Sequence, residues 1–256
     1  MSAVKLTYRN AVPCSMPAAS VETMCRDLVR RIRAEGKPGG DPKVQAYIGS
    51  PVPALGVPTE TIRGIRKGFV ESHPGLSVKT VNALADAMWK GQTFEEKAIA
   101  IGLLGAHLEI LDESSWRMMD RWVDEAVGWA LCDGIGSGPI ADMAYASPAR
   151  FREVLGWTKS ENYWRRRISA YALYDFVRKG ELDKPLALLE RLLYDDEFWV
   201  QRAVGTWLRE CWKKDEPRVR AFLRKHARGL PPVTITVATE RAPKAFREGL
   251  RRRARE

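Results

Sequence analysis

The sequence predicts an all-α protein built as a curved solenoid of antiparallel helix pairs. The first observation is a fixed period, because the aromatic residues Phe94, Trp129, Trp164 and Trp199 follow one another at intervals of 35 positions. The second is that apolar residues recur at spacings of three and four in most segments, as one face of a helix requires. The third is that runs of β-branched residues, which are typical of strands, are nearly absent.

The N-terminal part of the chain is expected to hold one amphipathic helix and a rigid crossing segment. Residues 20–34 place apolar side chains on one helix face behind an initial serine, and the glycines and prolines of residues 36–42 end that helix. Residues 43–49 form a short helical turn. The prolines of residues 50–58 exclude a helix there.

Downstream of residue 58, helical patterns alternate with short polar links, which favours antiparallel neighbours. Residues 233–237 follow two prolines and carry β-branched side chains, so we interpret them as an extended connector. The stack as a whole resembles HEAT-like repeats. We divide the chain into residues 1–40, an N-terminal arm and first helix, and residues 41–256, a single HEAT-like repeat domain. The expected helices are residues 59–72, 77–90, 94–108, 112–126, 129–146, 148–155, 162–178, 184–193, 198–213, 217–227 and 240–253.

The net charge of +10 lies entirely in the C-terminal part of the chain. Residues 1–150 carry 17 Lys+Arg and 17 Asp+Glu, whereas residues 151–256 carry 25 and 15. A solvated charged face is the plain interpretation of any basic run. Because the whole excess of positive charge, much of it arginine, lies in residues 151–256, a polyanionic partner is favoured instead, and nucleic acid is the commonest such partner.

Several classes of protein receive little support. No apolar run approaches the roughly 18–20 residues that cross a bilayer, and the first ten residues lack the apolar middle of a signal peptide, so we expect a cytoplasmic protein. We also expect a monomer. The four cysteines show no paired spacing and the three histidines lie far apart, so neither a metal site nor a disulfide framework is expected. The phosphate-binding motifs GxxxxGK[ST] and GxGxxG are absent, as are the motifs GxSxG of serine hydrolases and HExxH of zinc proteases. We expect no cofactor.

Asp133 is the strongest candidate for chemistry. The residues four positions after the other aromatic anchors are Ala98, Ile168 and Ala203, so this carboxylate occupies a slot that the repeat otherwise keeps apolar. Burial of an acid there is costly without a partner. A structural acid paired with an arginine of the next helix is the competing interpretation. Glycines directly after it, in residues 134–138, favour close approach by another group or simply a loose helix.

Trp129 and Trp164 are the second candidates. A tryptophan at a repeat anchor usually belongs to the core, but a tryptophan beside arginine also suits stacking on nucleotides or sugars. Successive residues of a helix are about 100° apart, so Arg165, Arg166 and Arg167 cannot all face one side. Arg167 aligns with Arg202 and, as a cation, with Lys97, which predicts a row of phosphate contacts. The further motifs that bear on function are Tyr47, Gly56-Val57-Pro58, Arg63, Trp129-x-x-x-Asp133, Asn162-Tyr-Trp-x-x-Arg167, Gln201-x-Ala203 and Leu208-Arg209-Glu210.

In this order and spacing, from about Tyr47 to Arg253, the motifs resemble the AlkD-type DNA alkylation repair glycosylases. These are HEAT-like proteins that remove alkylated purines from duplex DNA. The resemblance implies a monofunctional enzyme for cationic lesions such as 3-methyl- and 7-methylpurines, acting without drawing the base into a pocket. It also implies that the acid matching Asp133 lies beside the deoxyribose, that Trp129 packs on the sugar and backbone, and that Arg167 holds a phosphate.

These expectations define the candidate site. Asp133 is the catalytic residue, and the substrate-contacting and backbone-contacting residues are arranged around it. The family has a second pocket tryptophan where this chain has Thr206, and Trp207 is turned about 100° away on the helix, so it cannot simply substitute. The expected substrate contacts are Trp129, Arg167, Tyr47, Thr206 and Trp164, and the expected contacts to the DNA backbone are Arg166, Arg202, Arg209 and Arg241.

The leading hypothesis is therefore a glycosylase for N-alkylated purines in double-stranded DNA. An alkylated base is already cationic and leaves without a general acid, so a carboxylate near the developing sugar cation suffices. The alternatives are a non-catalytic HEAT-like protein that binds bent, branched or damaged DNA, and a protein–protein scaffold. The glycosylase hypothesis requires that the Asp133 carboxylate opens onto a basic, indole-walled surface and is not sealed in the interior by an arginine.

Overall fold

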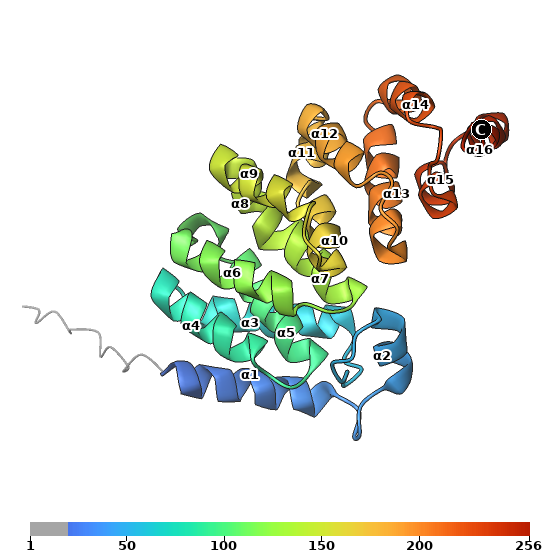
Figure 1. The fold of residues 1–256 in the computed structure, drawn as a ribbon. Helices are drawn as coiled ribbons and strands as arrows, with labels where there is room; N and C mark the ends of the chain where they lie inside the picture. The colour runs from blue at the N-terminus through green and yellow to red at the C-terminus, as the bar shows by residue number, and fades with distance from the viewer. Residues whose placement is uncertain (1–19) are drawn as a thin grey trace, which may run out of the picture.

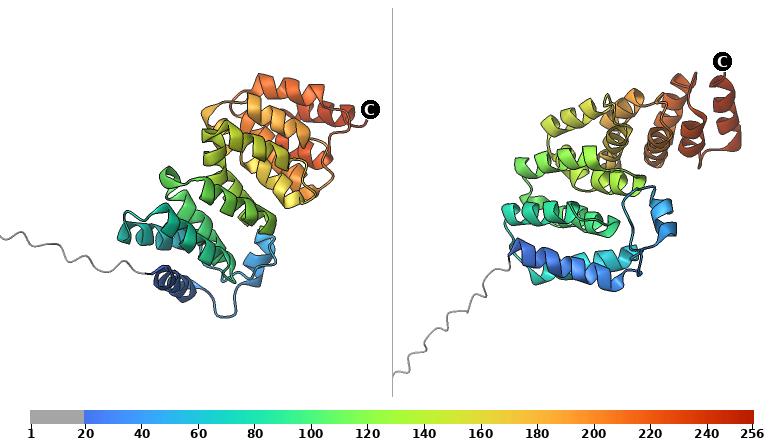
Figure 2. Two further views of the ribbon diagram at one scale, coloured as in Figure 1. Left: turned by 60° about the vertical axis from the view of Figure 1, so that its left-hand side comes forward. Right: turned by 60° about the horizontal axis from the view of Figure 1, so that its bottom comes forward.

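The computed structural model describes residues 20–256, and within that range the chain is helical and contains no strand. Successive helix pairs stack along a curved path from α1 at one end to α16 at the other (Figures 1 and 2), which confirms the predicted all-α solenoid. Residues 1–19, which hold the expected N-terminal arm, lie outside the described residues. The helices are α1 (Val21–Glu35), α2 (Pro42–Ile48), α3 (Thr59–Ser72), α4 (Val78–Trp89), α5 (Phe94–Gly105), η1 (Leu108–Ile110), α6 (Glu113–Glu125), α7 (Trp129–Ile135), η2 (Gly136–Ile140), α8 (Ala141–Ala146), α9 (Pro148–Trp157), α10 (Tyr163–Tyr171), α11 (Tyr174–Lys179), α12 (Asp183–Arg191), α13 (Phe198–Trp212), α14 (Glu216–Lys225), α15 (Pro232–Ala238) and α16 (Lys244–Arg253).

The 35-residue period marks the starts of four successive inner helices. Phe94 and Trp129 are the first residues of α5 and α7, and Trp164 and Trp199 are the second residues of α10 and α13. These helices pack in that order, α5 on α7, α7 on α10 and α10 on α13. A period in sequence therefore becomes a row of helix starts in space, as a solenoid requires.

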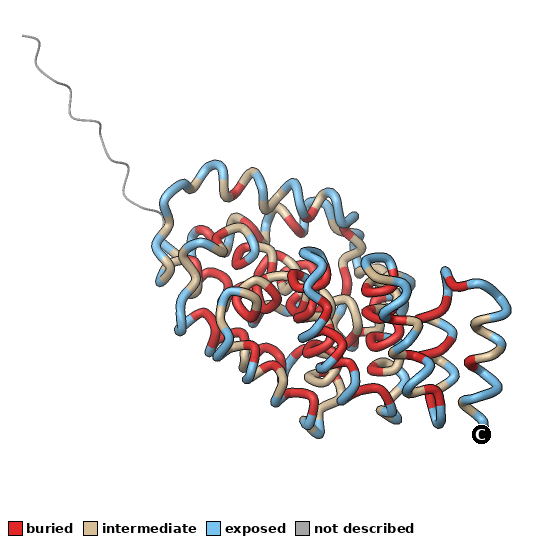
Figure 3. The backbone as a smooth tube through the Cα atoms, turned by 90° about the horizontal axis from the view of Figure 1, so that it is seen from above, coloured by how far each residue is buried: buried red, intermediate tan, exposed pale blue. Residues whose placement is uncertain are grey.

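Stacked tryptophans join the helices of the outer row. The rings of Trp89 and Trp122 lie 4.7 Å apart and nearly parallel, and those of Trp116 and Trp157 lie 5.7 Å apart. The indole N–H groups of the first pair donate to carboxylates on the neighbouring helices, so their burial leaves no polar group unsatisfied. Figure 3 shows buried segments alternating with exposed ones along each helix, as amphipathic packing requires.

Helix α1 packs against α3 and α4. Its apolar face buries Met24, Leu28 and Ile32, which belong to the same hydrophobic cluster as the inner helices. Ser20 caps its start by accepting a hydrogen bond from the backbone N–H of Thr23. The division of the chain at residue 40 stays a prediction, because contact between α1 and the repeats does not show whether they fold as one unit.

The extended connector expected for residues 233–237 is wrong, because this segment forms most of α15. Pro232 occupies the first helical position, where its missing N–H is not needed. The helix packs closely on α13 at Gly205, where an added Cβ would come within 2.6 Å of the Val237 Cβ. Burial of Thr234 and Ile235 against α13 outweighs the strand preference of β-branched residues, which is a weak local tendency.

Two helices predicted as continuous are interrupted, and one begins later than expected. Residues 129–146 divide into α7, η2 and α8, because Gly138 leaves helical geometry and Pro139 has no N–H to donate. Residues 162–178 divide into α10 and α11. Helix α16 begins only after Pro243.

Candidate functional site

A cavity of about 430 Å³ lies where α7, α10 and α13 begin, beside α2. Two of the repeat anchors, Trp129 and Trp199, line it, and of the residues four positions after the anchors only Asp133 does. Its walls come from four elements. The lining residues are Tyr47 from α2, Trp129 and Asp133 from α7, Arg167 and Tyr171 from α10, and Phe198, Trp199, Arg202, Thr206 and Arg209 from α13.

Asp133 and Arg167 form a forked ion pair at this cavity. Arg167 Nε and Nη2 donate to the two carboxylate oxygens of Asp133 at 2.7 and 2.8 Å. The Asp133 side chain is 19% exposed and the Arg167 side chain 5%. Burial raises the pKa of the Asp133 carboxyl, and the guanidinium opposes that shift. The acid is therefore neutralised by an arginine, as the structural interpretation requires, yet it also reaches the cavity surface, as the catalytic one requires.

Arg167 is bonded within the protein, and its expected contact with a phosphate stays a prediction. Besides Asp133, its guanidinium donates to the carbonyl oxygen of Trp199 at 2.6 Å and to the hydroxyl of Tyr171 at 3.1 Å. All three partners belong to the protein, and the side chain is almost fully buried. Arg167 thus orients Asp133 and joins α10 to α7 and α13.

Aromatic rings form the entrance on the side of α2. The Trp129 indole N–H donates to the carbonyl oxygen of Tyr47 at 2.6 Å, and the two rings meet edge to face at 5.3 Å. This contact needs Gly128, whose φ of 93° suits glycine and whose added Cβ would lie 2.4 Å from the Gly49 carbonyl oxygen. The Tyr47 side chain itself is 73% exposed.

The row of matching cations is only partly available at the surface. Arg202 is exposed and lies over the Phe198 ring at 5.8 Å. Arg209 lines the cavity but pairs with Glu240. Lys97 is half-buried and donates to the Trp89 carbonyl oxygen, and burial lowers its pKa. Of the three aligned cations Lys97, Arg167 and Arg202, the structure leaves Arg202 facing solvent.

Three other predicted contacts do not line the cavity. Trp164 is buried beside Trp199, with ring centroids 5.8 Å apart, so it follows the core interpretation of an anchor tryptophan. Arg166 forms a forked pair with Asp195 at 2.6 and 3.0 Å. Arg241 is exposed outside the cavity. The contacts of these residues with DNA stay predictions, and the first two already have partners within the protein.

The structure agrees with the expectation that Trp207 does not replace a tryptophan at position 206. Thr206 lines the cavity, whereas Trp207 is buried on the adjacent side of α13 and meets Tyr171 edge to face at 5.6 Å. Sequence reasoning missed Trp199, Tyr171 and Phe198 as lining residues. Signals in the sequence pointed to two of them, because Trp199 is a repeat anchor and Tyr171 lies one helical turn after Arg167.

Two further observations concern residues 20–256. No helix in this range is long and apolar enough to cross a membrane. The described residues contain no cluster of three or more His, Cys, Asp or Glu side chains that could hold a metal ion. The charged groups available at the cavity are therefore the aspartate and the arginines.

The fold and the cavity together define a class of protein, a helical-repeat solenoid whose inner helices hold an aspartate–arginine pair between aromatic walls. Residues 28–242 match the family described as DNA alkylation repair enzyme. The chain belongs to this family, which confirms the resemblance drawn from the motifs and supports a role in DNA repair. No curated protein matches the chain in sequence.

Solved structures share the fold. A protein described as a predicted DNA alkylation repair enzyme from Enterococcus faecalis has a TM-score of 0.70 at 16% identity, over 82% of this chain and 98% of that one. AlkD2 from Streptococcus mutans has a TM-score of 0.58 at 15% identity, over 85% of this chain and 98% of that one. At such identities the likeness shows the fold alone.

Proposed function

We propose that the protein is a DNA glycosylase that hydrolyses the N-glycosidic bond of cationic N-alkylated purines in duplex DNA. The observation that carries the proposal is the Asp133 carboxylate, which reaches a cavity walled by Trp129 and Trp199 inside a family of DNA alkylation repair enzymes. The net charge of +10 and the exposed Arg202 favour a polyanionic ligand.

The chemistry follows from the charge of the lesion. When the bond between the sugar C1′ and the base nitrogen breaks, the electron pair leaves with the base, and the cationic base becomes neutral without a proton donor. The sugar becomes an oxocarbenium ion, and a water oxygen then bonds to C1′ and loses a proton. A fixed anion near C1′ stabilises this transition state more than the ground state, which is the condition for catalysis.

Each residue of the cavity has a defined role in this proposal. Asp133 supplies the negative charge, and Arg167 holds its two oxygens in place. The electron-rich face of Trp129 adds a favourable field for a cation, whereas the Trp199 ring already has the Arg167 guanidinium 5.7 Å from its centroid. Arg202 faces solvent where a phosphate next to the lesion can approach. Because the stabilisation is modest, it suffices for a labile alkylated base and not for a normal one, which also provides selectivity.

A second candidate function is supported by the same ion pair. A carboxylate whose two oxygens are both held by a guanidinium has lost part of its field, and Thr206 leaves the cavity with one aromatic wall fewer than the family pattern predicts. Both features favour a non-catalytic protein that binds bent, branched or damaged DNA. Such a protein would bind structured duplexes in a salt-dependent manner and release no base.

Base release and binding, measured separately, decide between the two functions. Methylated duplex DNA is incubated with an excess of protein, and free 3-methyl- and 7-methylpurines are quantified against a protein-free control. The glycosylase proposal expects release by the wild type and strong loss in Asp133→Asn, with DNA binding retained. Binding without release from any alkylated duplex would establish the non-catalytic function instead.

A further inference from the structure

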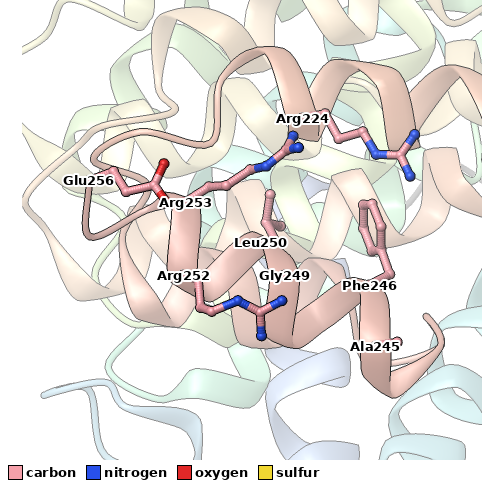
Figure 4. Close-up of a pocket in the computed structure, with 8 residues that line it drawn as sticks. All are labelled: Arg224, Ala245, Phe246, Gly249, Leu250, Arg252, Arg253 and Glu256. Carbon is pink, nitrogen blue, oxygen red and sulfur yellow. The ribbon is translucent and has the colours of Figure 1, made fainter.

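A second cationic cavity lies at the C-terminal end of the solenoid. It has a volume of about 270 Å³, and its lining includes Arg224 of α14 and Arg252 and Arg253 of α16. Figure 4 shows the side chain of Arg253 extending toward Arg224, with Leu250 and Phe246 beside them. Residues of two helices that are distant in sequence thus converge on one hollow. We call it the C-terminal arginine cavity.

Three arginines and one acid, Glu256, line this cavity, and Figure 4 shows the Glu256 carboxylate beside the Arg253 side chain. Within residues 20–256, Arg224, Arg252 and Arg253 make neither an ion pair nor a side-chain hydrogen bond. Neighbouring arginines on α14 behave differently, because Arg218 pairs with Asp183 and Arg220 with Glu216. Cations in the last turn of a helix are favoured by its dipole, but that effect does not bring two helix ends together around a hollow.

The chemistry of the lining selects a phosphate and not a base. The Phe246 ring is already covered by the guanidinium groups of Arg220 and Arg224, at 4.9 and 5.5 Å from its centroid, so it is not free for stacking. At Gly249 an added Cβ would meet only Arg252 Nη2, at 3.8 Å, so close packing does not require a glycine there. Because glycine has no side chain, no atoms of residue 249 beyond the backbone fill the cavity. Guanidinium forks match the oxygens of a phosphate.

We propose that the C-terminal arginine cavity binds backbone phosphates of duplex DNA that flanks the lesion. Arg209 of the first cavity pairs with Glu240, which lies in the link between α15 and α16. Such a contact positions the duplex without reading its sequence. The inference rests on the proposed function in that DNA is the ligand, but it does not require catalysis.

The test is the salt dependence of binding to an alkylated duplex. Each phosphate contact contributes about 0.9 to the slope of log K against log salt, so the double variant Arg224→Gln/Arg253→Gln is expected to lower the slope by about 1.8. The variant Arg224→Lys/Arg253→Lys keeps both charges and is expected to keep most of the slope. At saturating protein the rate of base release stays that of the wild type, because neither residue contacts Asp133.

The matched control removes two other exposed, unpartnered arginines, Arg33 of α1 and Arg152 of α9, by substitution with glutamine. It changes the net charge equally and is expected to leave the slope nearly unchanged. An unchanged slope in Arg224→Gln/Arg253→Gln, or an equal fall in the control, overturns the inference. Loss of binding to anionic vesicles or RNA without loss for duplex DNA overturns it as well. A slope change in a protein that releases no base sustains this inference while refuting the glycosylase.

Discussion

The ion pair at the first cavity leads to a prediction about two linked substitutions. In the wild type, the negative charge of Asp133 favours the sugar cation, and the positive charge of Arg167, held against both carboxylate oxygens, opposes it. Asp133→Asn removes the favourable charge and leaves the unfavourable one. The double variant Asp133→Asn/Arg167→Met removes both. If the field of the pair drives the reaction, the double variant is faster than the single one.

The magnitudes follow from the geometry of the pair. A carboxylate about 4 Å from the sugar cation stabilises it by about 4 kcal/mol at an effective dielectric of 20, and a guanidinium about 8 Å away opposes it by about 2 kcal/mol. The loss of Asp133 alone therefore slows base release by about a thousandfold. The loss of both charges removes only the net 2 kcal/mol, which corresponds to about thirtyfold. The second substitution thus restores about thirtyfold of the lost rate.

The assay is single-turnover release of methylated purine at saturating protein, which separates the chemical step from DNA affinity. Asp195→Asn is the matched control, because Asp195 forms a similar fork with Arg166 outside the cavity. We expect its rate to stay within about twofold of the wild type. Removing one partner of a buried pair is destabilising by about 3 kcal/mol, so the folded fraction of each variant is measured by urea unfolding. A double variant as slow as Asp133→Asn would refute the electrostatic argument.

Three further predictions follow from the described contacts. Base release is expected to fall as the pH drops through the pKa of Asp133, and this fall is expected above the usual aspartate range because burial raises that pKa. In Arg167→Met the fall is expected at a still higher pH, because the guanidinium that opposes the shift is gone; a pH–rate profile of each protein measures both. Trp129→Ala is expected to slow release by about fivefold, since one indole face contributes about 1 kcal/mol to a nearby cation; an unchanged single-turnover rate contradicts this. Gly205→Ala is expected to destabilise the protein by about 2 kcal/mol, because its Cβ would come within 2.6 Å of an α15 side chain. Gly64→Ala, whose Cβ would meet nothing within 4 Å on α3, is expected to stabilise the protein by about 0.5 kcal/mol. Urea unfolding midpoints in the reverse order would exclude this packing argument.

The repeat architecture could be predicted from the sequence because it depends on periodicity. Aromatic anchors at intervals of 35 define equivalent helix starts, and the apolar spacing within each helix defines the face that packs on the next. The same period singled out Asp133 as the acid in an apolar slot. The turn of about 100° between successive helix residues predicted that Trp207 cannot stand in for a residue at position 206. Both predictions concern a single helix or consecutive repeats, so the spacing of residues along the chain is enough to make them.

The local prediction failed where neighbouring helices decide the conformation. The β-branched segment at residues 233–237 is helical because Gly205 lets it pack closely on α13. Its strand preference is a small energy, and burial against another helix exceeds it. No pattern within the segment itself carries that information.

The partners of the charged residues were likewise decided by tertiary structure alone. Spacing along the chain did not predict that Arg167 faces Asp133 and the carbonyl oxygen of Trp199. Tyr47 and Trp129 meet although 82 positions separate them. The sequence by itself determined the stack of helices and the one acid in its apolar row. The distance between helices determined which charge faces which, because Coulomb energies depend on separation in space and not on spacing along the chain.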